Sequence, residues 1–520
     1  RFLQTTVHED YDFLLRKVDA ATFDREVEAL YEAIPDLADH EVIVGLARIV
    51  ALFQYGHTGI YTGGWYADEA TGFHQLPYQL YYFSDGLYVQ GVHQDYAEAL
   101  GAKVIAIEGM PIDEVLAAVR PVVSAENDQF FKAHGMTALG TLEVLHAQGV
   151  TETLQTSATL TLEKGGRTFD VTFSPVATEH YPGNYGLIQE DGEWLDARDN
   201  GTDPLWLSQL DKIYFYEYLP DSRTVYIRHS QIQDDPTINI PDFYAEVFKF
   251  IEEHEVDRLV LDVRLNGGGN NYKNKPIVTG VIRCEKINQP GKFIVIIGRR
   301  TFSACQNLVN ELDNYTEAVF FGEPTSENIN FYGDVNRPVL PNSQLTVRLS
   351  YAWWQDKPQW ENAPWLAPQV AVDLSFEDYQ TNHDPVLEAA LAYNDFRPFV
   401  DPIDSLSTLF MSGRVDEIEP TAKAMLADSR YRYYPFEERL NSAAYRIMNQ
   451  GMKQEAVFVF ELVTTLFPDS PNAWDSLAEG YWQAGNLDKA REYYQKAIDM
   501  DPDGPTGENA RRMLAEMDKE

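Results

Sequence analysis

Residues 259–270 read LVLDVRLNGGGN, a nearly continuous apolar run that ends in a charged turn and three glycines. A strand of a parallel sheet needs apolar side chains on both faces, because helices cover the sheet on both sides. Further strand-like runs occur at 224–228, 293–297 and 318–321. Helix-like segments lie between them, which predicts crossover units and an α/β core built on a parallel sheet.

Two loops are expected at the carboxyl edge of that sheet, where α/β proteins form their sites. The glycines at 267–269 let backbone amides lie bare beside a ligand. Residues 298–304 read GRRTFSA and place Ser303 at the start of a helix, where free amides and the positive dipole end would stabilise an oxyanion. Taken alone, Ser303 fits a helix cap better than a nucleophile, because serine is favoured at that position. A phosphate loop is disfavoured, because no Lys-Ser or Lys-Thr pair follows the glycines.

The first half of the chain divides into two parts. Residues 1–56 show helical spacing of apolar residues and end at Gly56-His57-Thr58-Gly59. Residues 101–112 predict a strand, a glycine turn and the start of a helix, and 159–173 predict a hairpin around Gly165-Gly166. This α+β unit resembles a PDZ domain, which binds an extended peptide at a sheet edge. A spacer without a ligand remains an equal alternative.

From about residue 400 the sequence becomes helical, with a period of about 34 residues, the length of a tetratricopeptide repeat. One unit matches that repeat at Trp474, Leu477, Ala478, Tyr481, Gly485, Ala490, Tyr494, Ala497 and Pro502. Such repeats bind partner proteins or self-associate through stacked helix pairs. The alternative is a plain helical hairpin packed on the core.

Composition excludes several classes of function. Asp and Glu number 81 against 41 Lys and Arg, a formal charge of −40, which argues against nucleic-acid binding. No apolar run has the length of a membrane-spanning helix. The two cysteines, Cys284 and Cys305, are too few for a disulfide framework or a zinc site, so we expect buried free thiols.

Three motifs taken together resemble the tail-specific (C-terminal-processing) serine peptidases. They are Asp-x-Arg-x-Asn-Gly-Gly-Gly from Asp262, Thr301-Phe302-Ser303-Ala304, and Gly322-Glu323-Pro324-Thr325. The likeness covers roughly residues 20–395. It implies a helical and β cap region at 1–95, a PDZ-like unit at 96–180 and an α/β peptidase core with a crotonase-like βαβ sheet at 181–398. The all-α repeat domain at 399–520 lies outside the resemblance.

The resemblance also implies roles for individual residues. Ser303 would be the nucleophile. A Ser-Lys dyad is not expected, because residues 322–328 contain no lysine. The tricorn-core-like branch instead uses histidine and glutamate, which implies His57 as general base and Glu361 as its partner, with Asp356 and Glu327 as rivals. Backbone amides of Gly267 or Gly268 and of Ala304 would bind the oxyanion.

These observations predict a serine endopeptidase or carboxy-terminal-processing peptidase that acts through an acyl-enzyme on peptide or protein substrates. We expect no metal and no organic cofactor, and a periplasmic or extracellular location, since such relatives are often exported. Two alternatives remain open. One is a catalytically inactive peptide- or ligand-binding protein on the same scaffold, and the other is an adaptor that acts through its repeats.

Overall fold

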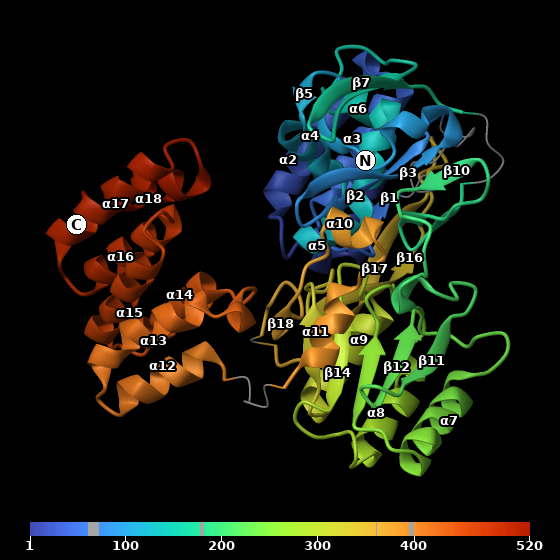
Figure 1. The fold of residues 1–520 in the computed structure, drawn as a ribbon. Helices are drawn as coiled ribbons and strands as arrows, with labels where there is room; N and C mark the ends of the chain where they lie inside the picture. The colour runs from blue at the N-terminus through green and yellow to red at the C-terminus, as the bar shows by residue number, and fades with distance from the viewer. Residues whose placement is uncertain (61–71, 177–180, 360, 395–399, 520) are drawn as a thin grey trace. The chain divides into compact units, whose positions relative to one another are not determined.

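The computed structural model describes the chain except residues 61–71, 177–180, 360, 395–399 and 520 (Figure 1). It divides into two compact units, Arg1–Phe396 and Arg397–Glu520.

The core of the first unit is a six-stranded sheet. Its strands are, in spatial order, β11 (Tyr214–Leu219), β12 (Thr224–His229), β13 (Arg258–Asp262), β14 (Phe293–Ile297), β15 (Val319–Gly322) and β18 (Val370–Ala371). All neighbours from β12 to β18 are parallel, and β11 is antiparallel to β12. The α/β core with a parallel sheet is therefore confirmed.

Helices cover this sheet on both faces, as its apolar strands require. Alternate residues of β13 and β14, such as Leu259 and Val295, pack with α7 (Ile240–Glu253), α8 (Lys275–Arg283) and α9 (Ala304–Tyr315). The intervening residues, such as Val260 and Ile294, pack with α11 (Pro385–Ala392). The short helix α10 (Phe376–Gln380) comes just before α11.

Three helices begin the chain: α1 (Phe2–Asp10), α2 (Ala20–Ala33) and α3 (Asp39–Ala51). They share a core with residues of a small antiparallel sheet, whose order is β1 (Gly59–Ile60), β17 (Val347–Gln355) and β16 (Asn330–Asn336). Because β1 follows His57 and β16 follows Glu327, this sheet brings the two segments into one region of the unit.

A second large sheet lies in the first unit. Its strands are β10 (Trp194–Asp196), β3 (Gly86–His93), β4 (Lys103–Ile107), β6 (Ala158–Lys164) and β7 (Arg167–Phe173), with β2 (Tyr78–Phe83) on β3 and β5 (Met110–Pro111) on β4. Its helices are α4 (Ile112–Val119), α5 (Asp128–His134) and α6 (Leu142–Ala147). The predicted hairpin is the β6–β7 pair, which turns through Gly165 and Gly166 at φ of 59° and 74°. A separate pair joins β8 (Gly183–Asn184) to β9 (Leu187–Ile188).

The second unit is helical where it is described. Its helices are α12 (Pro402–Met411), α13 (Ile418–Ala427), α14 (Phe436–Asn449), α15 (Lys453–Leu466), α16 (Pro471–Gln483), α17 (Leu487–Met500) and α18 (Pro505–Met517). Fully buried alanines, including Ala456, Ala478 and Ala490, let successive helices approach closely. The all-α C-terminal region is confirmed.

One expectation from composition is also met. Cys284 and Cys305 are buried free thiols. None of the helices in the described ranges is long and apolar enough to cross a membrane.

Candidate active site

Ser303 lies at a strained turn between β14 and α9. Its φ and ψ of 56° and −127° are unfavourable for a residue with a side chain, a strain often found at functional positions. Ser303 stands at the N-cap position but makes no side-chain cap bond. Its hydroxyl is thus not used to cap the helix.

Hydrogen bonds fix this turn to the glycine loop. The Thr301 hydroxyl donates to the carbonyl of Val263 at 3.0 Å, and the Phe302 amide donates to the carbonyl of Asn266 at 3.1 Å. The two loops predicted to share the carboxyl edge of the sheet are therefore in contact.

His57 reaches the serine from 246 residues earlier in the chain, with Nε2 2.9 Å from Ser303 Oγ. The imidazole stacks on the rings of Phe302 and Phe331, with centroids 4.5 Å and 6.0 Å away. Burial lowers the pKa of His57 to about 4, so the ring is neutral at pH 7 and has a free lone pair for a proton. This is the geometry a general base needs.

Glu327 lies on the other side of the imidazole. Its Oε1 is 3.0 Å from His57 Nδ1, within ion-pair distance, although the ring N–H is not aligned for a hydrogen bond. Its Oε2 accepts the amide of Ser303 at 2.5 Å. Burial raises the pKa of this fully buried carboxyl, while the Ser303 amide and Lys17 favour its charged form.

The structure places Glu327, and not Glu361, beside His57. The Glu361 carbonyl accepts from the Asn330 side chain at 3.2 Å, and no contact joins the Glu361 carboxylate to His57 among the described residues. Asp356, the other rival, accepts from Asn307 on α9 at 2.6 Å. The β16–β17 hairpin lies between the two glutamates in sequence and pairs with β1, which follows His57. This pairing is the physical reason that the segment before the hairpin, which carries Glu327, meets His57.

The glycine loop packs directly against the serine. The Gly268 amide donates to Asn266 Oδ1 at 2.9 Å, so it is engaged within the loop rather than free for a ligand. A Cβ on Gly268 would lie 2.6 Å from Ser303 Cβ and 2.9 Å from the Ala304 nitrogen. By contrast, the amides of Gly267, Gly269 and Ala304 donate to no protein group in the described part of the chain.

A cavity of about 330 Å³ opens onto Ser303. Its lining includes His57, Ser303, Gly269, Ala304, Asn307, Phe331, Asp334, Arg348 and Trp354. Gly269 and Ala304 thus face the space beside the hydroxyl, whereas Gly267 and Gly268 do not line it.

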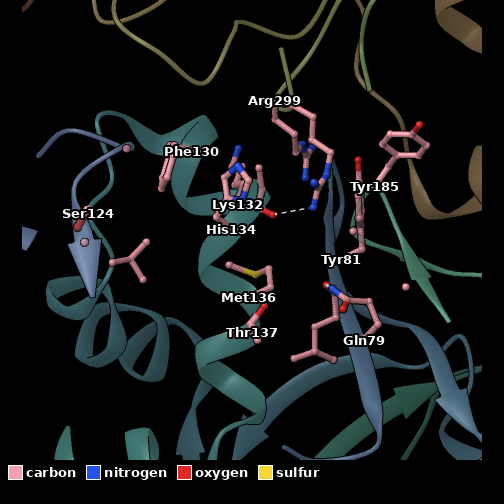
Figure 2. A pocket seen from close by; sticks show the side chains of 18 of the residues that line it. Gln79, Tyr81, Ser124, Phe130, Lys132, His134, Met136, Thr137, Tyr185 and Arg299 are labelled. Atoms are coloured by element: carbon pink, nitrogen blue, oxygen red, sulfur yellow. Dashed lines mark hydrogen bonds between the residues drawn. The ribbon is translucent and has the colours of Figure 1, made fainter. Parts of the chain in front are cut away.

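A second cavity of about 390 Å³ contains neither His57 nor Ser303 in its lining. Figure 2 shows Lys132 and His134 on one wall and Arg299 and Tyr81 on the facing wall. Arg299 is held by Glu323, with its Nε 2.8 Å from Oε2. This cavity is a neighbour of the serine turn, since Arg299 belongs to the same loop.

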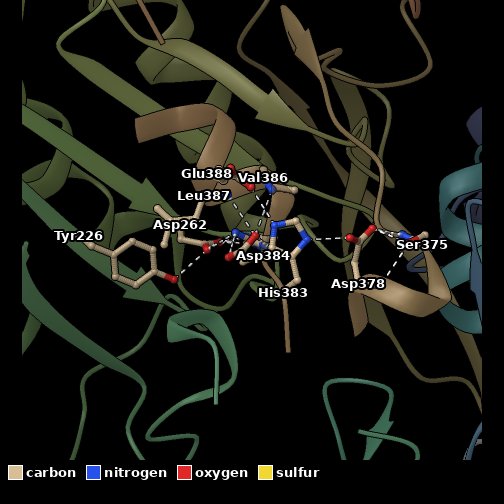
Figure 3. Close-up of polar contacts among 10 residues, drawn as sticks. Tyr226, Asp262, Ser375, Asp378, His383, Asp384, Val386, Leu387 and Glu388 are labelled. Carbon is tan, nitrogen blue, oxygen red and sulfur yellow. Dashed lines mark hydrogen bonds and ion pairs between the residues drawn. The ribbon is translucent and has the colours of Figure 1, made fainter. Parts of the chain in front are cut away.

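The charged residues of the Asp-x-Arg motif anchor the glycine loop (Figure 3). Arg264 donates to both carboxylate oxygens of Asp384 at 3.0 Å and to Asp262 Oδ1 at 3.0 Å. Tyr226 donates to Asp262 Oδ2 at 2.8 Å. The side chains of Asp262, Arg264 and Asp384 are at most 10% exposed. This buried network fixes the end of β13, from which the glycine loop continues.

Comparisons with known proteins agree with the architecture. The tetratricopeptide repeat family matches residues 471–503, which confirms the predicted repeat. No curated protein matches the chain. A crystal structure of a serine-to-alanine mutant of CPAF is similar over 76% of this chain and 97% of that chain, with 12% identity and a TM-score of 0.51.

Other similar structures are proteases by name. The photosystem II D1 C-terminal processing protease is 13% identical over 71% of this chain and 93% of its own, with a TM-score of 0.33. The tricorn protease is 14% identical over 75% of this chain and 36% of its own, with a TM-score of 0.32. At these identities the likeness concerns the fold alone.

Proposed function

We propose that this protein is a serine peptidase in which Ser303 is the nucleophile, His57 the general base and Glu327 the partner of His57. One observation carries the proposal: His57 Nε2 lies 2.9 Å from Ser303 Oγ while His57 Nδ1 lies 3.0 Å from a buried glutamate. A serine hydroxyl is a weak nucleophile and requires such a base. This arrangement supports a catalytic site over an inactive binding protein, since the base and the hydroxyl are within reach.

The reaction follows from the roles of these groups. Ser303 Oγ attacks the carbonyl carbon of a peptide while its proton passes to His57 Nε2. The C–N bond then breaks, and His57 returns the proton to the leaving amine. Water attacks the resulting ester, gives a proton to His57 and releases the acid product, after which Ser303 regains its proton. Glu327 holds the imidazole orientation and stabilises the imidazolium that forms.

We assign the oxyanion site to the amides of Ala304 and Gly269. Both residues line the cavity beside Ser303, and neither amide has a partner within the described chain. Gly268, which the sequence suggested, supports the site by its close packing instead. Charge on the oxygen would develop next to the N-terminus of α9, where the helix dipole is favourable.

Several finer assignments are proposals that rest on the family resemblance or, for the C-terminal repeats, on the period of about 34 residues. These are a PDZ-like unit at 96–180, a cap region at 1–95, a crotonase-like peptidase core at 181–398 and a repeat domain at 399–520. Peptides or proteins are the proposed substrates, and the repeats are proposed to bind a partner or a second copy. We also propose a periplasmic or extracellular location.

The proposed activity is tested by incubating the purified full chain with a pool of unstructured peptides and reading new termini by mass spectrometry. We expect cleavage that a fluorophosphonate blocks. A folded protein that leaves every peptide intact, and that no fluorophosphonate modifies, would contradict the proposal.

Glu327→Gln is expected to lower kcat by about 10⁴-fold, because a neutral amide neither fixes the productive tautomer nor stabilises the imidazolium. Glu361→Gln is the matched control and is expected to keep wild-type kcat. Initial rates on one cleaved peptide measure both variants. The opposite pattern, with Glu361→Gln impaired and Glu327→Gln active, would restore the sequence-based assignment.

Gly268→Ala is expected to reduce kcat by roughly 10²-fold, since a small displacement of the nucleophile is costly. The added methyl would meet Ser303 Cβ at 2.6 Å, and the backbone φ of 98° disfavours any side chain. Gly267→Ala is the folding control, because its methyl would meet nothing within 4 Å. Thermal melting should show Gly267→Ala near wild type and Gly268→Ala destabilised. Equal Tm values and wild-type kcat for Gly268→Ala would argue against this close packing.

A further inference from the structure

Glu126 links the two loops that carry His57 and Glu327. It lies between α4 and α5, far in sequence from both loops, and is 8% exposed. Its Oε1 accepts the amide of Gly56 at 2.8 Å, and its Oε2 accepts the amide of Asn328 at 3.0 Å. Gly56 directly precedes His57, and Asn328 directly follows Glu327.

The next residue strengthens the same connection. Asn127 donates through Nδ2 to the carbonyl of Pro364 at 2.5 Å and to that of Thr325 at 3.4 Å. The segment Glu126-Asn127 is thus fastened to the loop before β16 at more than one point. A carboxylate that accepts two backbone amides holds their separation more firmly than either bond alone.

Glu126 lies close to the side chains of the proposed base, His57, and its partner, Glu327. His57, Glu126 and Glu327 each offer a side-chain atom within 4.8 Å of the others. Lys17 acts electrostatically on both glutamates, and its ammonium donates to the carbonyl of Gln54 at 2.8 Å. Burial, followed by the charge of Glu327, raises the pKa of Glu126 to about 7.

We infer that Glu126 is a positioning residue of the active site, whose carboxylate sets the distance between the His57 loop and the Glu327 loop. This inference rests on the proposed function. Glu126 makes no contact with Ser303 among the described residues, so it would act through His57 and Glu327 rather than on the substrate.

The substitution Glu126→Gln tests this role with little change in volume. Glutamine keeps one acceptor oxygen, but its NH₂ group would face one of the two backbone amides, donor against donor. We expect kcat for a cleaved peptide, and the rate of Ser303 phosphonylation by a fluorophosphonate, to fall roughly 10- to 100-fold with KM unchanged. Glu143→Gln is the control, since Glu143 is a buried glutamate that instead accepts the amide of His74 at 2.7 Å.

A double-mutant cycle separates positioning from general stability. In a Glu327→Gln background, Glu126→Gln should have little further effect, because the contact that it positions is already lost. A wild-type rate of phosphonylation in Glu126→Gln would overturn the inference. So would a loss of that rate in Glu143→Gln equal to the loss in Glu126→Gln, when the two variants have the same Tm. Absence of phosphonylation in the wild-type chain would instead count against the proposed function.

Discussion

Ser303→Ala is expected to abolish peptide hydrolysis, with kcat reduced by about 10⁶-fold to the level that binding and oxyanion stabilisation alone provide. The hydroxyl oxygen, Ser303 Oγ, is the atom that forms the ester, so no neighbouring group replaces it. The fold should persist, because the Ser303 side chain does not cap α9 and its backbone amide still reaches Glu327. Steady-state rates and thermal melting of the purified variant measure both expectations.

Cys305→Ala is the matched control for this loss. Cys305 stands two residues further along on α9 and is fully buried, and burial raises the pKa of its thiol well above the ordinary value. A protonated, inaccessible thiol is not a nucleophile. Cys305→Ala should therefore keep wild-type activity. An active Ser303→Ala variant, or an inactive but folded Cys305→Ala variant, would contradict the assignment of the nucleophile.

His57→Ala is expected to lower kcat nearly as far as Ser303→Ala, by about 10⁶-fold, because the members of such a site act as a unit. Without the imidazole, the hydroxyl has no proton acceptor at 2.9 Å and the leaving amine has no proton donor. The double variant Ser303→Ala/His57→Ala should be scarcely slower than either single variant. Single and double variants are compared on the same peptide.

His74→Ala provides the control for His57. His74 also pairs with a buried glutamate, with its Nδ1 2.6 Å from Glu143 Oε1, but it lies just before β2 and 58% of its side chain is exposed. Its replacement should leave kcat unchanged. If the two histidine variants lost activity equally, His57 would have no special role.

Local patterns predicted the scaffold well. The apolar run at 259–263 and the glycines after it form β13 and its loop, because an apolar strand has few alternatives to a covered parallel sheet. The hairpin at Gly165-Gly166 and the repeat around Trp474 also follow from short-range signals, namely turn residues and a fixed period. The approach of His57 to Ser303 was expected from the motifs of the resemblance, although 246 residues separate them.

The partner of His57 could not be chosen from sequence, because three acids lay within the candidate region. The choice depends on how the β16–β17 hairpin pairs with β1, which is a tertiary feature. The engagement of the Gly268 amide was hidden for a related reason, since the side chain of Asn266 folds back onto it. Glu126 carries no local motif, and its role is visible only once its two amide contacts are known.

Covalent labelling tests most directly whether His57 and Glu327 make Ser303 a nucleophile. The full chain is treated with diisopropyl fluorophosphate, digested, and searched for the adduct by tandem mass spectrometry. We predict one adduct per chain, on Ser303, and none in the His57→Ala variant. Peptide hydrolysis by the treated chain is measured in parallel. Loss of this activity through an adduct on another residue, or full activity with Ser303 unmodified, would contradict this role of Ser303.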